Sequence, residues 1–360
     1  MPKKTSYPVL KGTLVIFLLT IVLVELAART PWAQKTFSYR SVDNFHYQFE
    51  IKWFRLQEYA EQNGGVDVII LGSSLVNTGI DPVVMAQAYF EQMGKRLRIF
   101  NFGVEGLSIT PNSVNARILV DEYHPALVIY VTEMRDFIAG VGLEYEQGFL
   151  ADPWIQYRQG KINLLGGLID NSMALQIFLP YRNWMRTDFP QTIHFFRYRS
   201  WNTSANGYEP EKAMGENVDS PPAANTPAEI ENFETFGNYK TAPSRLKDLE
   251  SILSLGKYGG TKVLIVEMPV HPTFYVYVGG EAVHKQFQLT ISSIVLKEGG
   301  SFIPAESCSA IPLEGRANRW HLNKLGAPAF STCLGQKLVL LANQQNTDFI
   351  NPDPLNSPAK

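Results

Sequence analysis

Cysteine is scarce in this chain of 360 residues, which contains only Cys308 and Cys333. Their spacing matches no zinc motif and no histidine cluster accompanies them, so we expect no metal site and no cofactor. An excess of one charge is also absent, because 32 Lys and Arg residues nearly balance 34 Asp and Glu residues. No overall field therefore attracts nucleic acid, and a partner must be recognised at a local site. Internal repeats are absent too, but a hydrophobic content of 45% is enough to fill a core.

The first thirty residues differ in kind from the rest of the chain. Three lysines lead into the uncharged run 12–24, which Glu25 interrupts and which then continues to about 17 apolar residues, the lower limit for a membrane-spanning helix. A cleaved signal peptide would share these features, but no small-x-small cleavage site precedes the polar stretch 30–34. We therefore predict that residues 1–30 form an uncleaved, single-pass anchor. The positive-inside rule then places the rest of the chain outside the cytoplasm, in a periplasmic or extracellular location.

Export changes the interpretation of the two cysteines. An oxidising compartment allows a disulfide between Cys308 and Cys333 to persist. Such a bridge would close a loop that contains His321. The alternative is two unpaired buried thiols, because sequence spacing does not determine the distance between the two Cα atoms.

From residue 66 onward, short β-rich apolar runs alternate with helix-like stretches, which is typical of βαβ units and a parallel sheet. The expected strands are 66–71, 98–102, 126–132, 262–267 and 301–303, and the expected helices are 82–94, 113–123, 244–255, 281–297 and 325–343. They predict an α/β, flavodoxin-like three-layer sandwich with a central parallel sheet over residues 66–136 and 242–345. Residues 31–65 are expected to form a linker and entry helix, and residues 346–360 a flexible tail.

A segment of about 110 residues separates the third strand from the fourth, which is far longer than an ordinary crossover. We therefore predict that residues 137–241 form a large insertion or cap. Its first half is rich in aromatic and aliphatic side chains, which predicts that it folds over the main domain as a lid, a glycan platform or ordinary packing. Its second half, 200–232, is acidic and rich in Pro, Ala and Asn, which predicts a mobile loop.

Two short motifs contain the residue types that nucleophilic catalysis needs. Segment 71–75 reads Leu-Gly-Ser-Ser-Leu directly after the first strand, where a parallel sheet presents its carboxyl edge to ligands. Segment 318–323 reads Asn-Arg-Trp-His-Leu-Asn and comes just before the last helix. Ser74 and His321 are far apart in the sequence, but they can meet at one edge of the sheet as nucleophile and base.

These blocks resemble those of the SGNH (GDSL-like) hydrolase superfamily, in its membrane-anchored, extracytoplasmic branch. The match covers residues 66–136 and 261–343. The resemblance implies that Ser74, the last Ser of the first block, is the nucleophile and that His321 is the general base. It also implies an oxyanion hole formed by the backbone N–H groups of Ser74 and of Gly103, which lies in the segment Asn-Phe-Gly-Val-Glu-Gly.

Two positions depart from the family pattern. Arg135 replaces the Asn that the family uses in the oxyanion hole, and Asn318 replaces the Asp that orients the His. An Arg can donate hydrogen bonds to an oxyanion, or it can instead pair with Asp136 or an insertion carboxylate. An Asn carbonyl can accept the Nδ1 hydrogen of His321, whereas a flipped amide would favour the wrong tautomer. Since an Asp-to-Asn change costs serine proteases about 10⁴ in kcat, we expect tuned or reduced activity.

Two further residues are weaker candidates for substrate binding. His271 follows the fourth strand directly, and Trp320 lies inside the last block. The alternatives are a structural hydrogen bond for His271 and a place in the core for Trp320.

The sequence therefore predicts a serine esterase or O-acyltransferase that works through an acyl-enzyme on Ser74. Its location suggests that it acts on acyl esters, in particular acetyl esters, of extracytoplasmic glycans or lipids. Nothing in the sequence separates hydrolysis from acyl transfer. One alternative is a catalytically silent envelope protein that binds glycans or assists assembly. A phosphate- or flavin-binding domain is a weaker alternative, because Gly-Ser-Ser is too short to cradle a phosphate.

Overall fold

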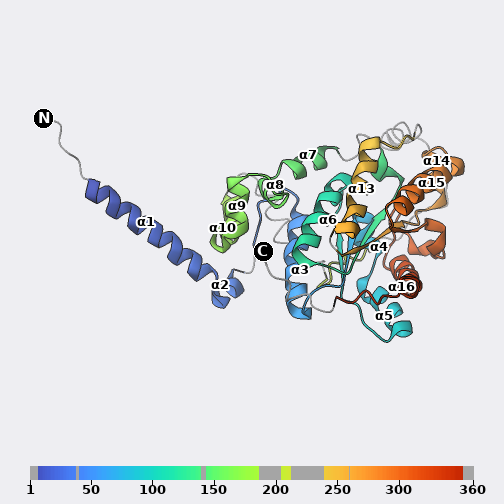
Figure 1. Ribbon diagram of the computed structural model, residues 1–360, viewed down its shortest axis with the longest axis horizontal. Coiled ribbons are helices and arrows are strands. Elements are labelled where there is room, and N and C mark those ends of the chain that lie inside the picture. Colours follow the sequence, from blue (N-terminus) through green and yellow to red (C-terminus); the bar gives the residue numbers. More distant parts are fainter. Residues whose placement is uncertain are drawn as a thin grey trace. The chain divides into compact units, whose positions relative to one another are not determined.

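The computed structural model describes residues 7–37, 40–138, 143–185, 204–211, 239–258 and 260–351 (Figure 1). Two compact units make up the chain. The smaller unit contains residues 1–50 and 149–197, and the larger unit contains residues 51–148 and 198–360. Apart from 204–211 and 346–351, the predicted mobile loop and the predicted tail lie outside the described residues.

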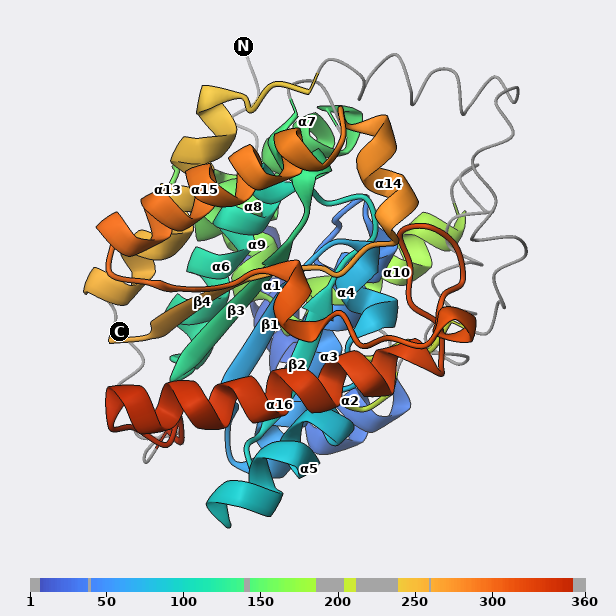
Figure 2. The same cartoon turned by 90° about the vertical axis from the view of Figure 1, so that its right-hand side faces the viewer.

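A parallel sheet of five strands forms the centre of the larger unit, with the strand order β2-β1-β3-β4-β5 (Figure 2). The strands are β1 (Val68–Gly72), β2 (Ile99–Gly103), β3 (Leu127–Thr132), β4 (Lys262–Glu267) and β5 (Ser301–Ile303). All residues of β1, β2 and β3 are buried, as expected for strands that are covered on both faces. The predicted α/β class and central parallel sheet are confirmed, and β4 and β5 have the predicted bounds.

Helices lie along both sides of this sheet. In Figure 2, α6 (Ile109–Tyr123), α13 (Pro243–Tyr258) and α15 (Glu281–Lys297) are on one side, and α5 (Pro82–Met93) and α16 (Gly326–Gln345) are on the other. The start of α5 follows from its sequence, because the Asp81 carboxylate accepts the N–H of Val83 and Pro82 occupies the first turn. Gly335 allows α16 to pack tightly on α5, since a Cβ there would lie 2.5 Å from the Met85 carbonyl oxygen.

Shorter elements surround the carboxyl edge of the sheet in the larger unit. They are α4 (Ser74–Gly79), the 3-10 helices η1 (Met134–Phe137), η2 (Ala305–Cys308) and η3 (Leu313–Gly315), and α14 (Pro272–Tyr277). Two further helices, α3 (Tyr47–Asn63) and α7 (Leu143–Ala151), include residues of both units. The polar residues that the sequence analysis selected lie on or next to these short elements.

The smaller unit is helical in its described part. It contains α1 (Tyr7–Ala28), α2 (Pro31–Thr36), α8 (Pro153–Arg158), α9 (Leu164–Asn171) and α10 (Met173–Met185). In α1, the 19 residues Leu10–Ala28 have a mean hydropathy of 2.2, so this helix is long and apolar enough to cross a membrane. The predicted N-terminal apolar helix is therefore confirmed.

A disulfide joins Cys308, at the end of η2, to Cys333 in α16. Their Cα atoms are 5.8 Å apart, which is within the range that a disulfide requires. The expected bridge is therefore present, and the alternative of two unpaired thiols is excluded. The loop that it closes contains Asn318 and His321.

Candidate active site

Ser74 is the first residue of α4 and directly follows the turn at the end of β1. Gly72 makes this turn with a φ of +154°, and a Cβ at this position would lie 2.6 Å from the Val131 carbonyl oxygen. Ser73 is the N-cap of α4, and its hydroxyl accepts the Leu75 N–H at 3.4 Å. Ser73 therefore caps the helix, and the hydroxyl of Ser74 next to it is available for chemistry.

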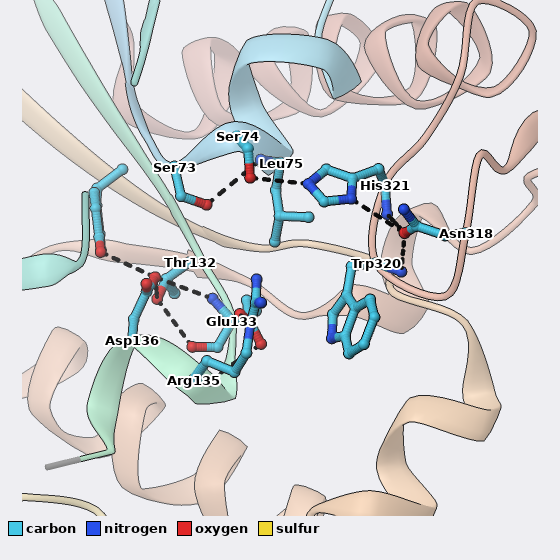
Figure 3. A network of polar contacts seen from close by, with 11 residues as sticks. Ser73, Ser74, Leu75, Thr132, Glu133, Arg135, Asp136, Asn318, Trp320 and His321 are labelled. Carbon is cyan, nitrogen blue, oxygen red and sulfur yellow. Dashed lines mark hydrogen bonds and ion pairs between the residues drawn. The ribbon is translucent and has the colours of Figure 1, made fainter. Parts of the chain in front are cut away.

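Ser74, His321 and Asn318 form a continuous line of hydrogen bonds (Figure 3). The Ser74 hydroxyl lies 2.8 Å from Nε2 of His321, and Nδ1 of the same imidazole lies 3.1 Å from Oδ1 of Asn318. The tertiary structure thus brings together the two motifs from opposite ends of the sequence. The arrangement is that of a nucleophile, its base and the group that orients the base.

The orientation of the Asn318 amide is determined by the backbone around it. Its Oδ1 also accepts the backbone N–H groups of Trp320 and His321, both at 2.9 Å. A flipped amide would direct its NH₂ group at these two donors and lose both bonds. Because Oδ1 faces His321, Nδ1 carries the hydrogen and Nε2 presents its lone pair to Ser74. The amide at this position therefore favours the productive tautomer.

Burial and a nearby cation keep His321 neutral. Desolvation by burial and, to a lesser extent, the positive charge of Arg135 lower the pKa of His321 to about 4, while Glu211 acts in the opposite direction. The imidazole is therefore uncharged at neutral pH, which is the form that accepts a proton. The low pKa also means that an imidazolium at this position would receive little stabilisation.

Arg135 lies in the site, but Glu133 already binds part of its guanidinium. Its Nε donates to the Glu133 carboxylate, and its Cζ lies 5.5 Å from the centre of the Trp320 ring (Figure 3). Among the described residues, the partner of Arg135 is Glu133 and not Asp136, which was one of the alternatives; the carboxylates of residues 212–238 lie outside the described residues. Asp136 instead accepts the hydroxyl groups of Thr132 at 2.7 Å and Tyr130 at 3.0 Å, so that its carboxylate stabilises the turn after β3.

The Gly103 N–H, which was predicted to help form the oxyanion hole, has a partner within the fold. This N–H donates to Oδ1 of Asn101 at 2.9 Å and is therefore already satisfied within the fold. A Cβ at Gly103 would lie 2.5 Å from the backbone nitrogen of Asn77, so glycine is needed here for the close approach of β2 and α4. Gly103 thus acts through packing behind the nucleophile.

The two weaker candidates occupy different places. His271 is the N-cap of α14, where its Nδ1 lies 2.8 Å from the Thr273 hydroxyl. It also lines a cavity of about 330 Å³, and neither Ser74 nor His321 contributes to that cavity. Trp320 forms part of the wall of the candidate site, between Arg135 and Phe274, whose ring centroid is 6.0 Å away.

Sequence reasoning missed a fully buried lysine behind α4. Lys52 of α3 donates from Nζ to Oδ1 of Asn77 at 2.6 Å and to the carbonyl oxygens of Gly207 at 2.5 Å and Asn101 at 3.2 Å. Desolvation by burial lowers the pKa of Lys52 to about 8. Lysine is usually found at a protein surface, so a helical pattern alone gives no signal for this role.

Comparisons with known proteins give little further information. No family model and no curated protein matches the chain. One solved structure, described as "a putative platelet activating factor from Streptococcus pneumonia", is 12% identical with a TM-score of 0.39. The match covers 82% of this chain and 94% of that one, but a likeness this low assigns neither a fold nor a function. Within the described residues, no three His, Cys, Asp or Glu side chains are grouped so as to hold a metal ion.

Proposed function

We propose that this protein is a membrane-anchored serine esterase or O-acyltransferase of the SGNH (GDSL-like) type. The observation that carries the proposal is the hydrogen-bonded line from Ser74 through His321 to Asn318 at the carboxyl edge of the sheet. The strand order and the helices on both sides of the sheet support a flavodoxin-like three-layer sandwich as its fold. The apolar helix α1 supports the anchor, and the lysines before it support an extracytoplasmic catalytic unit.

The reaction begins when Nε2 of His321 takes the proton of Ser74 as Oγ attacks the ester carbonyl. The Nδ1–H remains bonded to Asn318 while the imidazole is charged. His321 then gives the proton to the departing alkoxide, which leaves as an alcohol and forms the acyl-enzyme. A water molecule that loses its proton to His321 then attacks the acyl carbon, and His321 returns this proton to Oγ of Ser74 as the acid is released, whereas a sugar hydroxyl in place of water forms a new ester.

Two donors are candidates to stabilise the oxyanion. The backbone N–H of Ser74 is at the start of α4, where no carbonyl of the preceding turn can accept it. The guanidinium of Arg135 has five N–H donors, and its Nε bond to Glu133 leaves the two terminal NH₂ groups for substrate. We assign Arg135 this role because the site holds it beside Trp320, facing His321.

The proposed substrates are acyl esters, in particular acetyl esters, of glycans or lipids outside the cytoplasm. This assignment rests on the anchor and its predicted orientation. A soluble ester such as p-nitrophenyl acetate would report the acyl-enzyme chemistry without the natural acceptor.

Covalent labelling tests the proposal directly. The full chain in detergent should react with a fluorophosphonate, and mass spectrometry should locate the adduct on Ser74. We expect Ser74→Ala to abolish both the labelling and the turnover of p-nitrophenyl acetate. The matched control is Ser73→Ala, which removes the neighbouring hydroxyl and should keep both. Labelling that persists in Ser74→Ala, or is absent in the native chain, would refute the enzyme.

Two contacts favour a second candidate, a catalytically silent SGNH-like envelope protein that binds glycans or assists assembly. Asn101 already accepts the Gly103 N–H, and Glu133 already binds Arg135. Such a protein would bind an acetylated glycan but would neither consume it nor react with the fluorophosphonate. Isothermal titration with acetylated and deacetylated glycan oligomers, combined with the labelling result, separates the two functions.

A further inference from the structure

The leucine side chains of helix α9 are exposed at the surface of the protein instead of being buried in its core. Gly166 and Ile169 face the protein, whereas Leu164, Leu165 and Leu168 are 83%, 49% and 62% exposed. Ile162, in the turn before the helix, is 99% exposed. An amphipathic helix of a globular domain normally buries its leucines, so this orientation indicates that something apolar covers the outer face.

Two glycines allow α9 to pack closely on α8 with its leucines facing outward. A Cβ at Gly166 would lie 2.0 Å from the Pro153 carbonyl oxygen, and one at Gly167 would lie 3.0 Å from the Tyr157 ring. Only glycines allow α9 to pack this closely on α8. The glycine side of α9 therefore faces α8, and the leucines lie on the other side.

The end of α1 shows what covers the exposed face. Glu25, in the last turns of α1, accepts the Met173 N–H at 2.9 Å and the Ser172 hydroxyl at 2.8 Å, so it caps the start of α10. Arg29 donates to the carbonyl oxygen of Asn171, the last residue of α9, at 2.8 Å. These bonds hold the α9–α10 junction beside the C-terminal end of α1 (Figure 1). Because α9 has 8 residues, it is about 12 Å long, so all of its residues lie within about 12 Å of the α9–α10 junction.

Residues typical of a membrane interface occur in the same unit. Trp32 of α2 is 71% exposed, immediately after the end of α1, and Lys35 follows it one turn later. Lys161 is exposed next to Ile162. Tryptophan and lysine are enriched where a spanning helix leaves the hydrocarbon, because one part of each side chain is apolar and the other remains in water.

We propose that α9 and the preceding turn lie in the membrane interface and bind lipid, as a second membrane contact beside α1. Ile162, Leu164 and Leu168 contact acyl chains, and Lys161 contacts lipid phosphates. A groove of about 920 Å³, lined in part by Tyr157, Lys161, Ile162, Leu164 and Leu168, provides room for an acyl chain. The proposal rests on the membrane anchor of the proposed function and does not depend on its chemistry.

Fluorescence quenching in a bilayer tests this contact. The native cysteines are bonded to each other, so single cysteines at Leu164, Leu168 and Lys161 can be labelled selectively with an environment-sensitive dye. The full chain is reconstituted in vesicles of phosphatidylcholine and phosphatidylglycerol with or without doxyl-labelled lipid. Leu296→Cys on α15, which is 68% exposed, is the matched control, and Ile21→Cys reports α1. Circular dichroism checks that each variant folds.

We expect dyes at residues 164 and 168 to show blue-shifted emission, strong quenching by doxyl lipid and protection from iodide. The dye at residue 161 should be quenched by shallow doxyl groups, and the dye at residue 296 should respond only to iodide. Responses at 164 and 168 equal to that at 296 would overturn the proposal. A blue shift without lipid quenching would also overturn it, because another protein surface would then cover α9. If the dye at residue 21 is quenched while the dyes on α9 are not, the proposed lipid contact of α9 is refuted and the membrane anchor α1 is supported. If the dye at residue 21 is not quenched, α1 does not span the membrane, and both the anchor and the lipid contact of α9 are refuted.

Discussion

The two sides of the candidate site differ in how completely they are assembled. On the side of the base, Ser74, His321 and Asn318 already form an unbroken line of hydrogen bonds. On the oxyanion side, the Gly103 N–H and the Nε of Arg135 are both engaged in bonds to the protein itself. In the proposed enzyme, proton transfer is preorganised, whereas oxyanion stabilisation depends on the Ser74 N–H and the remaining donors of Arg135.

The group that orients the proposed base His321 is the amide of Asn318, which is uncharged, where a carboxylate would carry a negative charge. Asn318 orients the imidazole but supplies no negative charge to stabilise the imidazolium, and the nearby Arg135 disfavours that charge. A base with a pKa of about 4 accepts a proton from serine less readily than one with a pKa near 7. We therefore expect slow turnover even where the geometry is correct.

Removing the orienting amide would break the assembled side and should have the largest effect. In Asn318→Ala, His321 loses its Nδ1 acceptor and two backbone N–H groups lose theirs. We expect the rate of fluorophosphonate labelling at Ser74 to fall about 10³-fold, less than the roughly 10⁴-fold cost of changing the orienting Asp in serine proteases, because Asn318 supplies no charge that could be lost. The matched variant Asn318→Asp keeps an oxygen that can accept all three bonds and adds a charge that raises the pKa of His321, so it should react faster than the native chain. Equal rates in the two variants would show that Asn318 does not orient the base.

Opening the disulfide would loosen the loop that carries the base. Replacing Cys308 and Cys333 together with serine removes a closure across a sequence separation of 25. We expect a loss of about 3 kcal/mol in the free energy of unfolding of the larger unit, measured by urea titration. Reduction of the native chain should give the same loss, and both should slow the labelling of Ser74. Unchanged labelling would mean that the fold holds His321 without the bridge.

Arg135→Asn tests how much the charge of Arg135 contributes to the pKa of His321 and to stabilisation of the oxyanion. His321 is the active base only when neutral, so native activity should persist as pH falls and be lost near the pKa of about 4. Removing the positive charge of Arg135 raises this pKa, so the acid limb of the kcat/KM profile should move to higher pH. At neutral pH we expect kcat to change by about tenfold or less, because an asparagine can also donate to an oxyanion. Arg117→Gln, which changes an exposed arginine of α6, is the charge-matched control and should leave the profile unmoved.

Ser73→Ala should have the smallest effect. It removes the N-cap of α4, but the bond to the Leu75 N–H is long at 3.4 Å. We expect a loss of about 1 kcal/mol or less in the free energy of unfolding, with the pKa of His321 unchanged. A large loss of labelling in this variant would instead mean that the cap positions the nucleophile.

The five strands of the sheet, the long helices that follow them in the chain, the apolar helix α1 and the two motifs that meet as Ser74 and His321 were predicted from the sequence. Buried strands and capped helices leave local patterns of polarity, and a parallel sheet brings the carboxyl ends of its strands to one edge. These features depend on residues that are close in the sequence. They were therefore predictable before any contact was known.

The hydrogen-bond partner of each polar group could be identified only from the three-dimensional contacts. The choice of Glu133 over Asp136 by Arg135, and of Asn101 by the Gly103 N–H, depends on distances between groups that all had suitable chemistry. The burial of Lys52 depends on acceptors from α4, β2 and the segment 204–211, which no local pattern connects. The outward leucines of α9 follow from glycines that pack on α8. Local patterns determine the element on which a residue lies, but competition among nearby donors, acceptors and surfaces is settled only by their arrangement in three dimensions.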